Sequence, residues 1–389
     1  MKSEFAGQLR CPACGCDGTL QLRAQDSDEH EVREGWLRCK ACATEFPLHR
    51  GVPELLSEPP ADILAEAAGL ERFADDMRGE GWGPETVLQL PDIEHGYWYV
   101  QSRSMHQLLR TIPFQAGQSI VDVGSNTCWA ANHFAERGLH AIALDIATVE
   151  LQGLYTADYF FERGGAFFER MLGSMAAIPL ASSSVDYVYC CEVLHHNDAD
   201  SLRRTFEEIY RVLRPGGRLL MVNETLRTLR DPGGVHVAGV EQYEGYEHAH
   251  WALRYRWEAT RAGFMTDVTE PHYRSFFGDG EFVGASDGDA GVAPGRRLGF
   301  ALRRFGLVRR IYLMWLNHLW GGVSMNMIAT KPARYLGRRR RMLPGERILR
   351  MLAAGVRLRR ERRRGEAPPR LPRTPEQAQE EFLRVTSAR

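Results

Sequence analysis

Two apolar, β-branched segments that each reach an aspartate constrain the fold of this chain more than any other feature. Residues 119–124 read Ser-Ile-Val-Asp-Val-Gly, and residues 139–145 read Leu-His-Ala-Ile-Ala-Leu-Asp. Such runs are typical of strands that are buried in a parallel sheet. Asp122 and Asp145 are 23 residues apart, close to the ~20 residues expected between a glycine turn and the ribose-binding acid of a βαβ nucleotide unit. Residues 127–137 between them have helical spacing.

The same alternation continues along the chain. Residues 184–191 form a third apolar run, and residues 202–213 carry apolar side chains at the spacing of an amphipathic helix. Arg214-Pro-Gly-Gly217 ends that helix, and residues 218–223 are a further strand candidate. Alternating strands and helices predict an α/β fold with a doubly wound, mostly parallel sheet, whose ligand binds at the carboxyl ends of the strands.

The ordered motifs resemble the class I S-adenosylmethionine (SAM)-dependent methyltransferases, and most closely their quinone-biosynthesis branch. They are Asp-Val-Gly-Ser-Asn-Thr at 122–127, Leu-Asp at 144–145, residues 177–186, Glu-Val-Leu-His-His at 192–196 and Val-Leu-Arg-Pro-Gly-Gly at 212–217. The resemblance covers residues 115–335. It implies a seven-stranded, Rossmann-like sheet whose last two strands, antiparallel, lie within residues 264–269 and 322–330.

The resemblance also implies a cofactor site. Gly124 would let the backbone approach the methionine part of SAM, and Asp145 would accept hydrogen bonds from the ribose. Asn126 and Cys128 stand where the family has its second and third turn glycines, and Asn tolerates positive φ better than Cys. The incomplete glycine turn argues against NAD-type binding. The full set of expected cofactor residues is Asp122, Gly124, Asn126, Asp145, Ser174, Met175 and Cys191.

Histidines near the carboxyl edge of the predicted sheet are the candidate catalytic bases. Methyl transfer to a hydroxyl needs aligned reactants and a group that takes the proton. His195 and His196 follow the fourth strand, and His248 and His250 come later; each could instead be a structural loop or core histidine. Glu224, just after the fifth strand, is placed to orient one of them.

Two Cys-x-x-Cys motifs indicate a zinc ribbon. Cys11-Pro-Ala-Cys14 and Cys39-Lys-Ala-Cys42 are separated by 24 residues, slightly more than the usual spacing. Four thiolates fill a tetrahedral site and leave no open position, so we expect structural zinc rather than catalytic zinc. The alternatives are a ribbon without metal and a variant site that uses Cys16. With residues 46–56, the motifs resemble the small zinc-ribbon protein that binds and activates tRNA and rRNA methyltransferases.

The formal net charge of −1 conceals a split that bears on partners. Residues 331–389 carry 18 Lys and Arg against 6 Asp and Glu, whereas residues 1–330 carry 31 against 44. The acidic body suits a neutral or cationic acceptor better than a polyanion, and we expect a small molecule or glycan, although the basic tail could bind RNA or anionic lipid. Residues 296–320 place Arg pairs among large apolar residues, which is typical either of an interfacial helix on an anionic membrane or of a helix packed on the sheet.

These patterns predict four regions: a zinc ribbon (1–57), a helical connector or lid (58–116), a methyltransferase domain (117–335, insert 276–321) and an Arg-rich tail (336–389). In the connector, residues 61–69 and 102–111 are expected helices, with aromatic residues 94–99 between them as lid or packing. No secretory signal or membrane-spanning run is apparent, which favours a cytoplasmic or peripheral protein. We expect a SAM-dependent O-methyltransferase with a biosynthetic role. The alternatives are an RNA methyltransferase and a non-catalytic scaffold with a degenerate cofactor site.

Overall fold

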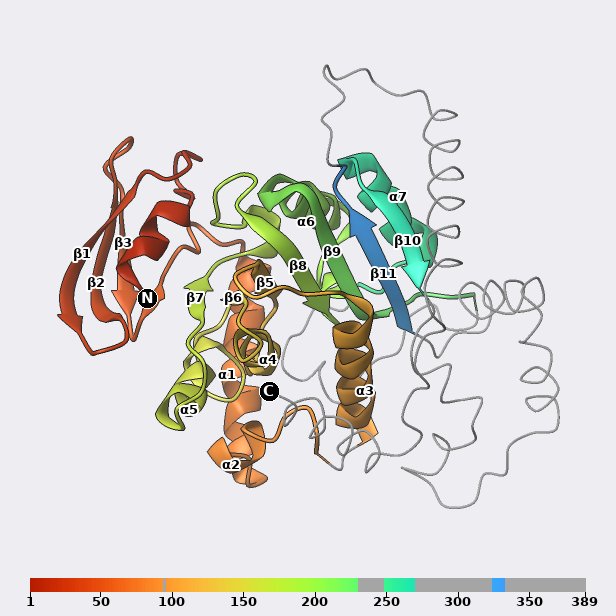
Figure 1. The fold of residues 1–389 in the computed structure, drawn as a ribbon, viewed down its shortest axis with the longest axis horizontal. Helices are drawn as coiled ribbons and strands as arrows, with labels where there is room; N and C mark the ends of the chain where they lie inside the picture. The colour runs from red at the N-terminus through yellow and green to blue at the C-terminus, as the bar shows by residue number, and fades with distance from the viewer. Residues whose placement is uncertain (94–95, 230–247, 270–323, 333–389) are drawn as a thin grey trace.

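The described residues form two β-sheets, each of which belongs to a separate part of the chain (Figure 1). The structure is a computed structural model that describes residues 1–93, 96–229, 248–269 and 324–332. The four-stranded sheet lies at one end of the molecule, and strands β10 and β11 lie toward the opposite end (Figure 1). The expected insert 276–321, the basic stretch 296–320 and the tail 336–389 lie outside the described residues.

The N-terminal sheet is antiparallel, in the order β1-β2-β3-β4. It consists of β1 (Leu20–Ser27), β2 (Val32–Cys39), β3 (Glu45–His49) and β4 (Val52–Pro53), and a 3₁₀ helix, η1 (Ser3–Gln8), precedes it. Arg50 and Gly51, which connect β3 to β4, both have positive φ, +47° and +78°. This is the backbone twist that a tight two-residue hairpin turn requires.

The second sheet has seven strands in the order β10-β11-β9-β8-β5-β6-β7. The parallel strands are β5 (Ser119–Val123), β6 (His140–Asp145), β7 (Glu169–Leu172), β8 (Val185–Cys191) and β9 (Leu213–Thr225). Strand β11 (Ser324–Thr330) runs antiparallel to β9 and to β10 (Met265–Thr269). The expected doubly wound, mostly parallel seven-stranded sheet is therefore confirmed.

Helices and 3₁₀ turns connect these strands. They are α4 (Trp129–Ala135), η2 (Leu154–Thr156), α5 (Ala157–Glu162), η3 (Met175–Ala177), η4 (Leu194–His196), α6 (Ala199–Val212) and α7 (Ala252–Ala262). The sequence of α6 favours a helix for two reasons. Asp198 caps its start by accepting hydrogen bonds from the amides of Asp200 and Ser201, and its apolar positions at helical spacing are buried. The helix expected over 127–137 is shorter, because Cys128 is left-handed (φ +59°) and α4 begins only at Trp129.

The connector contains α1 (Ala61–Gly79), α2 (Pro84–Val87) and α3 (Gly96–Thr111). Two expected boundaries were wrong: α1 continues ten residues beyond Gly69, and α3 begins at Gly96 rather than at Ser102. Most of the aromatic segment is therefore the first turn of a helix. Its Trp98 packs against Trp82 and, edge-on, against Trp129, with ring centroids 6.4 and 6.2 Å apart.

The N-terminal domain adds to the edge of the larger sheet. Glu54 forms a parallel bridge with Leu172 of β7, and the Leu55 amide donates to the Leu172 carbonyl at 2.9 Å. Near the other end of the contact, the Ala181 amide donates to the carbonyl of Gln8 at 2.8 Å. Strand β7 would otherwise be an edge with unsatisfied backbone groups, so this contact protects the sheet.

A buried ionic network lies in the same interface. Arg170 of β7 is fully buried and pairs with Asp158 at 2.8 Å and with Glu31 of the N-terminal domain. Arg33 contacts the same two carboxylates, Glu31 at 2.7 Å and Asp158 at 3.1 Å. Gly51 is required beside them, because a Cβ there would lie 2.5 Å from the Arg170 Nη2 atom. The two domains are thus joined by charges that are withdrawn from water as well as by backbone hydrogen bonds.

Within the described residues, no helix combines the length and the hydropathy that a membrane span requires.

Candidate active site

The turn after β5 keeps the left-handed geometry of a glycine turn with only one glycine. Gly124, Asn126 and Cys128 have φ values of +68°, +46° and +59°. A Cβ on Gly124 would lie 2.2 Å from the Val193 side chain, so glycine is required there. Asn and Cys at positive φ store backbone strain, which is characteristic of functional sites. The non-glycine residues therefore preserve the turn, although with strain.

Asp145, the expected ribose-binding acid, ends β6 with its side chain buried. Its Oδ2 accepts from the Asn126 amide at 2.7 Å, and its Oδ1 accepts from the amides of Ile146 and Ala147 at 2.7 and 3.1 Å. These hydrogen bonds lower the pKa of Asp145, but burial has the larger effect and raises the pKa to about 6. A carboxylate has about four lone-pair positions, so Asp145 can still accept from a ligand hydroxyl.

The other expected cofactor residues line the same edge of the sheet. Asp122 is buried in β5 and accepts from the Ser125 hydroxyl at 2.8 Å; burial and the charge of Asp145 raise the pKa of Asp122 to about 7. Ser174 caps η3 by accepting from the Ala176 amide at 3.2 Å. Cys191 is the last residue of β8.

His195 and Glu224 form a buried pair where β8 and β9 end. The His195 Nδ1 atom lies 2.7 Å from Glu224 Oε1, and Glu224 also accepts from the backbone amides of Leu194 and His195, both at 3.0 Å. Burial by itself raises the pKa of Glu224, but the charge of His195 and these hydrogen bonds bring the pKa below its ordinary value. An ionised Glu224 fixes the Nδ1–H tautomer of His195 and turns Nε2 away from the carboxylate.

His196 pairs with a residue of the connector that the sequence patterns did not single out. Its Nδ1 atom lies 2.9 Å from Oε1 of Glu66 in α1. The imidazole rings of His195 and His196 are 4.4 Å apart, and the charge of Glu66 acts on Asp145. Helix α1 thus brings a carboxylate close to His196 and near enough to Asp145 to act on its charge. No local signal marks Glu66, because it is one of several acids on an amphipathic helix.

The later histidines lie at the same edge of the sheet but farther out. The His248 amide donates to the His195 carbonyl at 2.7 Å, while the His248 residue is exposed. His250 contacts the Asn197 carbonyl through Nε2 at 2.8 Å, and burial lowers the pKa of His250. The structure therefore brings together His195 and His196, whereas His250 contacts the Asn197 carbonyl and His248 lies at the periphery.

Helix α3 supplies a second group that was missed. Gln101 is 1% exposed, and its Oε1 accepts from Asn223 Nδ2 at 3.1 Å and lies 2.9 Å from Cys191 Sγ. Its Nε2 is buried and, within the described residues, has no hydrogen-bond partner. A buried amide N–H without a partner is costly, so it suits a ligand oxygen at the ends of β8 and β9.

The four expected metal ligands form one cluster. The Sγ atoms of Cys11, Cys14, Cys39 and Cys42 lie within 4.8 Å of one another, and the Cys11–Cys42 and Cys14–Cys39 separations are both 3.7 Å. Thiolates about 2.3 Å from a central zinc at tetrahedral angles lie roughly 3.8 Å apart. The sulfur geometry therefore fits a tetrahedral metal, and Cys16 is not part of the cluster.

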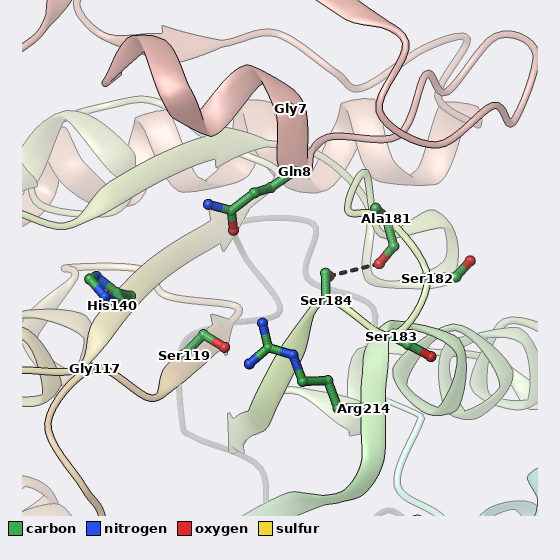
Figure 2. Close-up of a pocket in the computed structure, with 10 residues that line it drawn as sticks. All are labelled: Gly7, Gln8, Gly117, Ser119, His140, Ala181, Ser182, Ser183, Ser184 and Arg214. Atoms are coloured by element: carbon green, nitrogen blue, oxygen red, sulfur yellow. Dashed lines mark hydrogen bonds between the residues drawn. The ribbon is translucent and has the colours of Figure 1, made fainter.

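A cavity of about 360 Å³ opens at the opposite, amino-terminal edge of the sheet (Figure 2). Gly7 and Gln8 of the N-terminal domain line one side, and His140 and Arg214 lie at the starts of parallel strands. Arg214 pairs with Asp186 at 2.8 Å, so its charge is balanced. Ligands of doubly wound sheets bind at the carboxyl ends of strands, which makes this cavity a poor candidate for the active site.

Comparison with known proteins identifies the central part of the chain. Residues 121–221 match the family model described as "Methyltransferase domain". The chain is 26% identical over 194 residues to the sterol 24-C-methyltransferase ERG6A of Gibberella zeae, a match that covers 48% of this chain and 50% of the relative. It is 31% identical over 107 residues to the malonyl-[acyl-carrier protein] O-methyltransferase of Erwinia billingiae, covering 27% of this chain and 38% of the relative.

Among solved structures, the fold is similar to the phosphoethanolamine N-methyltransferase 2 of Haemonchus contortus in complex with SAM. The TM-score is 0.43 at 16% identity, over 75% of this chain and 63% of that chain. The chain spans half or less of the length of the two curated relatives. By the family match, residues 121–221 form a methyltransferase domain, and they lie in a Rossmann-like, mostly parallel seven-stranded sheet.

Proposed function

We propose that the chain is a SAM-dependent methyltransferase that methylates a hydroxyl of a small molecule or glycan. The observation that carries this proposal is the position of the histidine–glutamate pairs at the carboxyl edge of the sheet, next to Asp145 in a matched methyltransferase domain. SAM, when bound, supplies an electrophilic methyl group. Asp145, which retains acceptor capacity, would hold a ribose hydroxyl, and the turn from Gly124 to Cys128 would face the methionine part.

In this proposal His196 is the general base. Glu66 lies 2.9 Å from its Nδ1 atom and would stabilise the imidazolium that forms when the ring takes the hydroxyl proton. His195 is a positioning residue, because Glu224 holds both its ring and its backbone amide and thereby fixes the turn that carries His196. This arrangement places a carboxylate beside the proposed base, where it favours the protonated ring.

A hydroxyl acceptor is favoured over RNA by the charge around the site. The charged groups that the structure records beside His196 are the carboxylates of Glu66 and Glu224, which do not attract the phosphates of RNA. Gln101 Nε2 would donate to an oxygen of the acceptor or of the cofactor. One histidine as base and a second that positions it suit the removal of a proton from an alcohol, because an alcohol retains its proton at neutral pH.

For the N-terminal domain we propose a structural zinc ion held by Cys11, Cys14, Cys39 and Cys42. The support is the tetrahedral spacing of the four sulfurs. Four protein ligands leave no position for water or substrate, so the metal would organise the ribbon rather than take part in methyl transfer.

Isothermal titration calorimetry with SAM tests the cofactor assignment directly. The wild-type chain should bind SAM, and Asp145→Asn should bind it more weakly, because the amide presents one acceptor oxygen in place of two. The absence of binding heat in the folded wild-type chain would contradict the proposal.

The acceptor class is tested by measuring release of S-adenosylhomocysteine with a panel of phenols, sugars and polyols. His196→Gln should lower kcat without weakening SAM binding. Transfer of a labelled methyl group to total RNA, with none to the hydroxyl panel, would overturn the proposed acceptor class in favour of the RNA alternative.

A further inference from the structure

The loop that follows Asp145 is closed on itself and tied to the proposed cofactor site. The amides of Leu154 and Tyr155 donate to the carbonyls of Ala147 and Thr148 at 3.1 and 2.9 Å. At its inner side, Gln152 is 5% exposed and accepts from the Asn126 side chain at 2.7 Å. We call residues 146–155 the ribose loop, because its first two amides also hold Asp145. The position of Asp145 therefore depends on the position of this loop.

A single arginine of the N-terminal domain holds the outer side of the ribose loop. Both Nη atoms of Arg50 donate to Glu150 Oε1 at 3.1 Å. Its Nη2 also donates to Asp158 at 2.8 Å, and its guanidinium lies 4.2 Å from the centre of the Tyr155 ring. Glu150 and Tyr155 belong to the loop, and Asp158 follows it in α5. One planar cation thus joins three points of the segment through two ion pairs and a cation–π contact.

The backbone at Arg50 has a conformation that arginine does not favour. Arg50 has φ +47° and is followed by Gly51 at +78°. A hairpin turn of this geometry favours Asn-Gly, because asparagine tolerates the left-handed region and arginine does so less well. Backbone strain that the surroundings maintain is a reason to look for a functional role.

We propose that Arg50 is a positioning residue for SAM binding, which holds the ribose loop, and through it Asp145 and Asn126, in the cofactor-competent arrangement. The inference rests on the proposed function and gives the zinc-ribbon domain a direct part in it. The domain that carries the cysteine cluster then contributes to cofactor affinity through a named side chain, in addition to covering the edge of the sheet.

The expected effect is moderate, because Arg50 and Glu150 are 39% and 33% exposed. If loss of the guanidinium reduces the population of the competent loop to about one tenth, the apparent Kd for SAM rises about tenfold. A change of that size is within reach of two partly exposed ion pairs and one cation–π contact taken together.

Arg50→Asn separates this role from a merely structural one, because asparagine fits the turn but lacks the guanidinium. The experiment measures SAM binding by calorimetry and thermal unfolding in the absence of SAM. We expect only a small change in Tm, because the better fit of asparagine to the turn offsets part of the lost contacts, together with a Kd about tenfold higher. Arg50→Lys should give an intermediate Kd, since an ammonium can pair with one carboxylate but cannot bridge both in one plane.

The matched control is Arg38→Ala, which removes a similarly exposed arginine of the same domain, paired with Glu45 at 3.7 Å and without a contact to the ribose loop. It should bind SAM like the wild-type chain. Hydrogen exchange of the peptide containing Leu154 and Tyr155 should quicken in Arg50→Asn and slow again on saturation with SAM. Should that variant not fold, Glu150→Gln carries the same test from the loop side.

The outcomes distinguish this inference from the proposed function. A wild-type chain that does not bind SAM contradicts the proposed function itself. A wild-type chain that binds SAM, with Arg50→Asn or Glu150→Gln binding equally well, overturns the role of Arg50. An equal loss in Arg38→Ala also overturns it, because the effect would then come from general destabilisation of the domain.

Discussion

Arg170→Met is the substitution that most sharply tests how the two domains are held together. The Arg170 side chain is fully buried in the interface, and the side chains of its partners Glu31 and Asp158 are only 2% and 9% exposed. Removing one member of a buried ionic group typically costs about 3–5 kcal/mol, since it leaves a buried charge with less compensation. Here Arg33 still contacts both carboxylates, so we expect the lower end, about 3 kcal/mol.

The assay is urea unfolding followed by circular dichroism, with thermal unfolding beside it. A loss of about 3 kcal/mol corresponds to a decrease in Tm of roughly 6–12 °C for a domain of this size. The matched control is Arg163→Met, which breaks an ion pair with Glu85 in which the side chains are 58% and 78% exposed. The control should leave the unfolding midpoint unchanged. Equal effects of the two substitutions would refute the reasoning, because burial would then not decide the contribution of the ion pair.

Four further outcomes are expected. Gly124→Ala should destabilise the chain by about 3 kcal/mol in urea unfolding, because the left-handed backbone and a Cβ placed 2.2 Å from Val193 both oppose it; wild-type stability would contradict the turn geometry. SAM affinity measured against pH should fall by up to about tenfold per unit below pH 6, since the pKa of Asp145 is about 6 and only the carboxylate accepts fully; a flat profile between pH 5 and 7 would count against Asp145. Cys42→Ser should lower the zinc content found by elemental analysis and lower the Tm; an unchanged zinc-to-protein ratio would exclude it as a ligand. Glu224→Gln should shift the pH profile of turnover and reduce kcat more than it raises the Kd for SAM; equal loss of both would indicate a purely structural carboxylate.

Patterns that act over a few residues were readable from the sequence. The buried strands that carry Asp122 and Asp145 have a period and composition typical of a parallel sheet, and their alternation with helices predicts the doubly wound arrangement. The two Cys-x-x-Cys turns also predict their own cluster, because each turn by itself places two thiols together. Element boundaries were less well defined: α1 was expected to end at Gly69 but ends at Gly79, since tertiary contacts extend the helix beyond its clear local pattern.

Only the tertiary structure decided which distant side chains meet. Glu66 reaches His196, Gln101 reaches Cys191, and Arg50 reaches Glu150 across separations of 130, 90 and 100 residues. Nothing in the local sequence distinguishes these residues from other polar side chains on a helix or in a turn, because their partners are supplied by the packing of whole elements. The sequence by itself therefore determined the strands, the acids at their ends and the cysteine turns, through local periodicity and spacing. Packing of whole elements decided the surroundings of those acids: α1 brings the charge of Glu66 to Asp145, and the N-terminal domain contacts the loop whose amides hold Asp145.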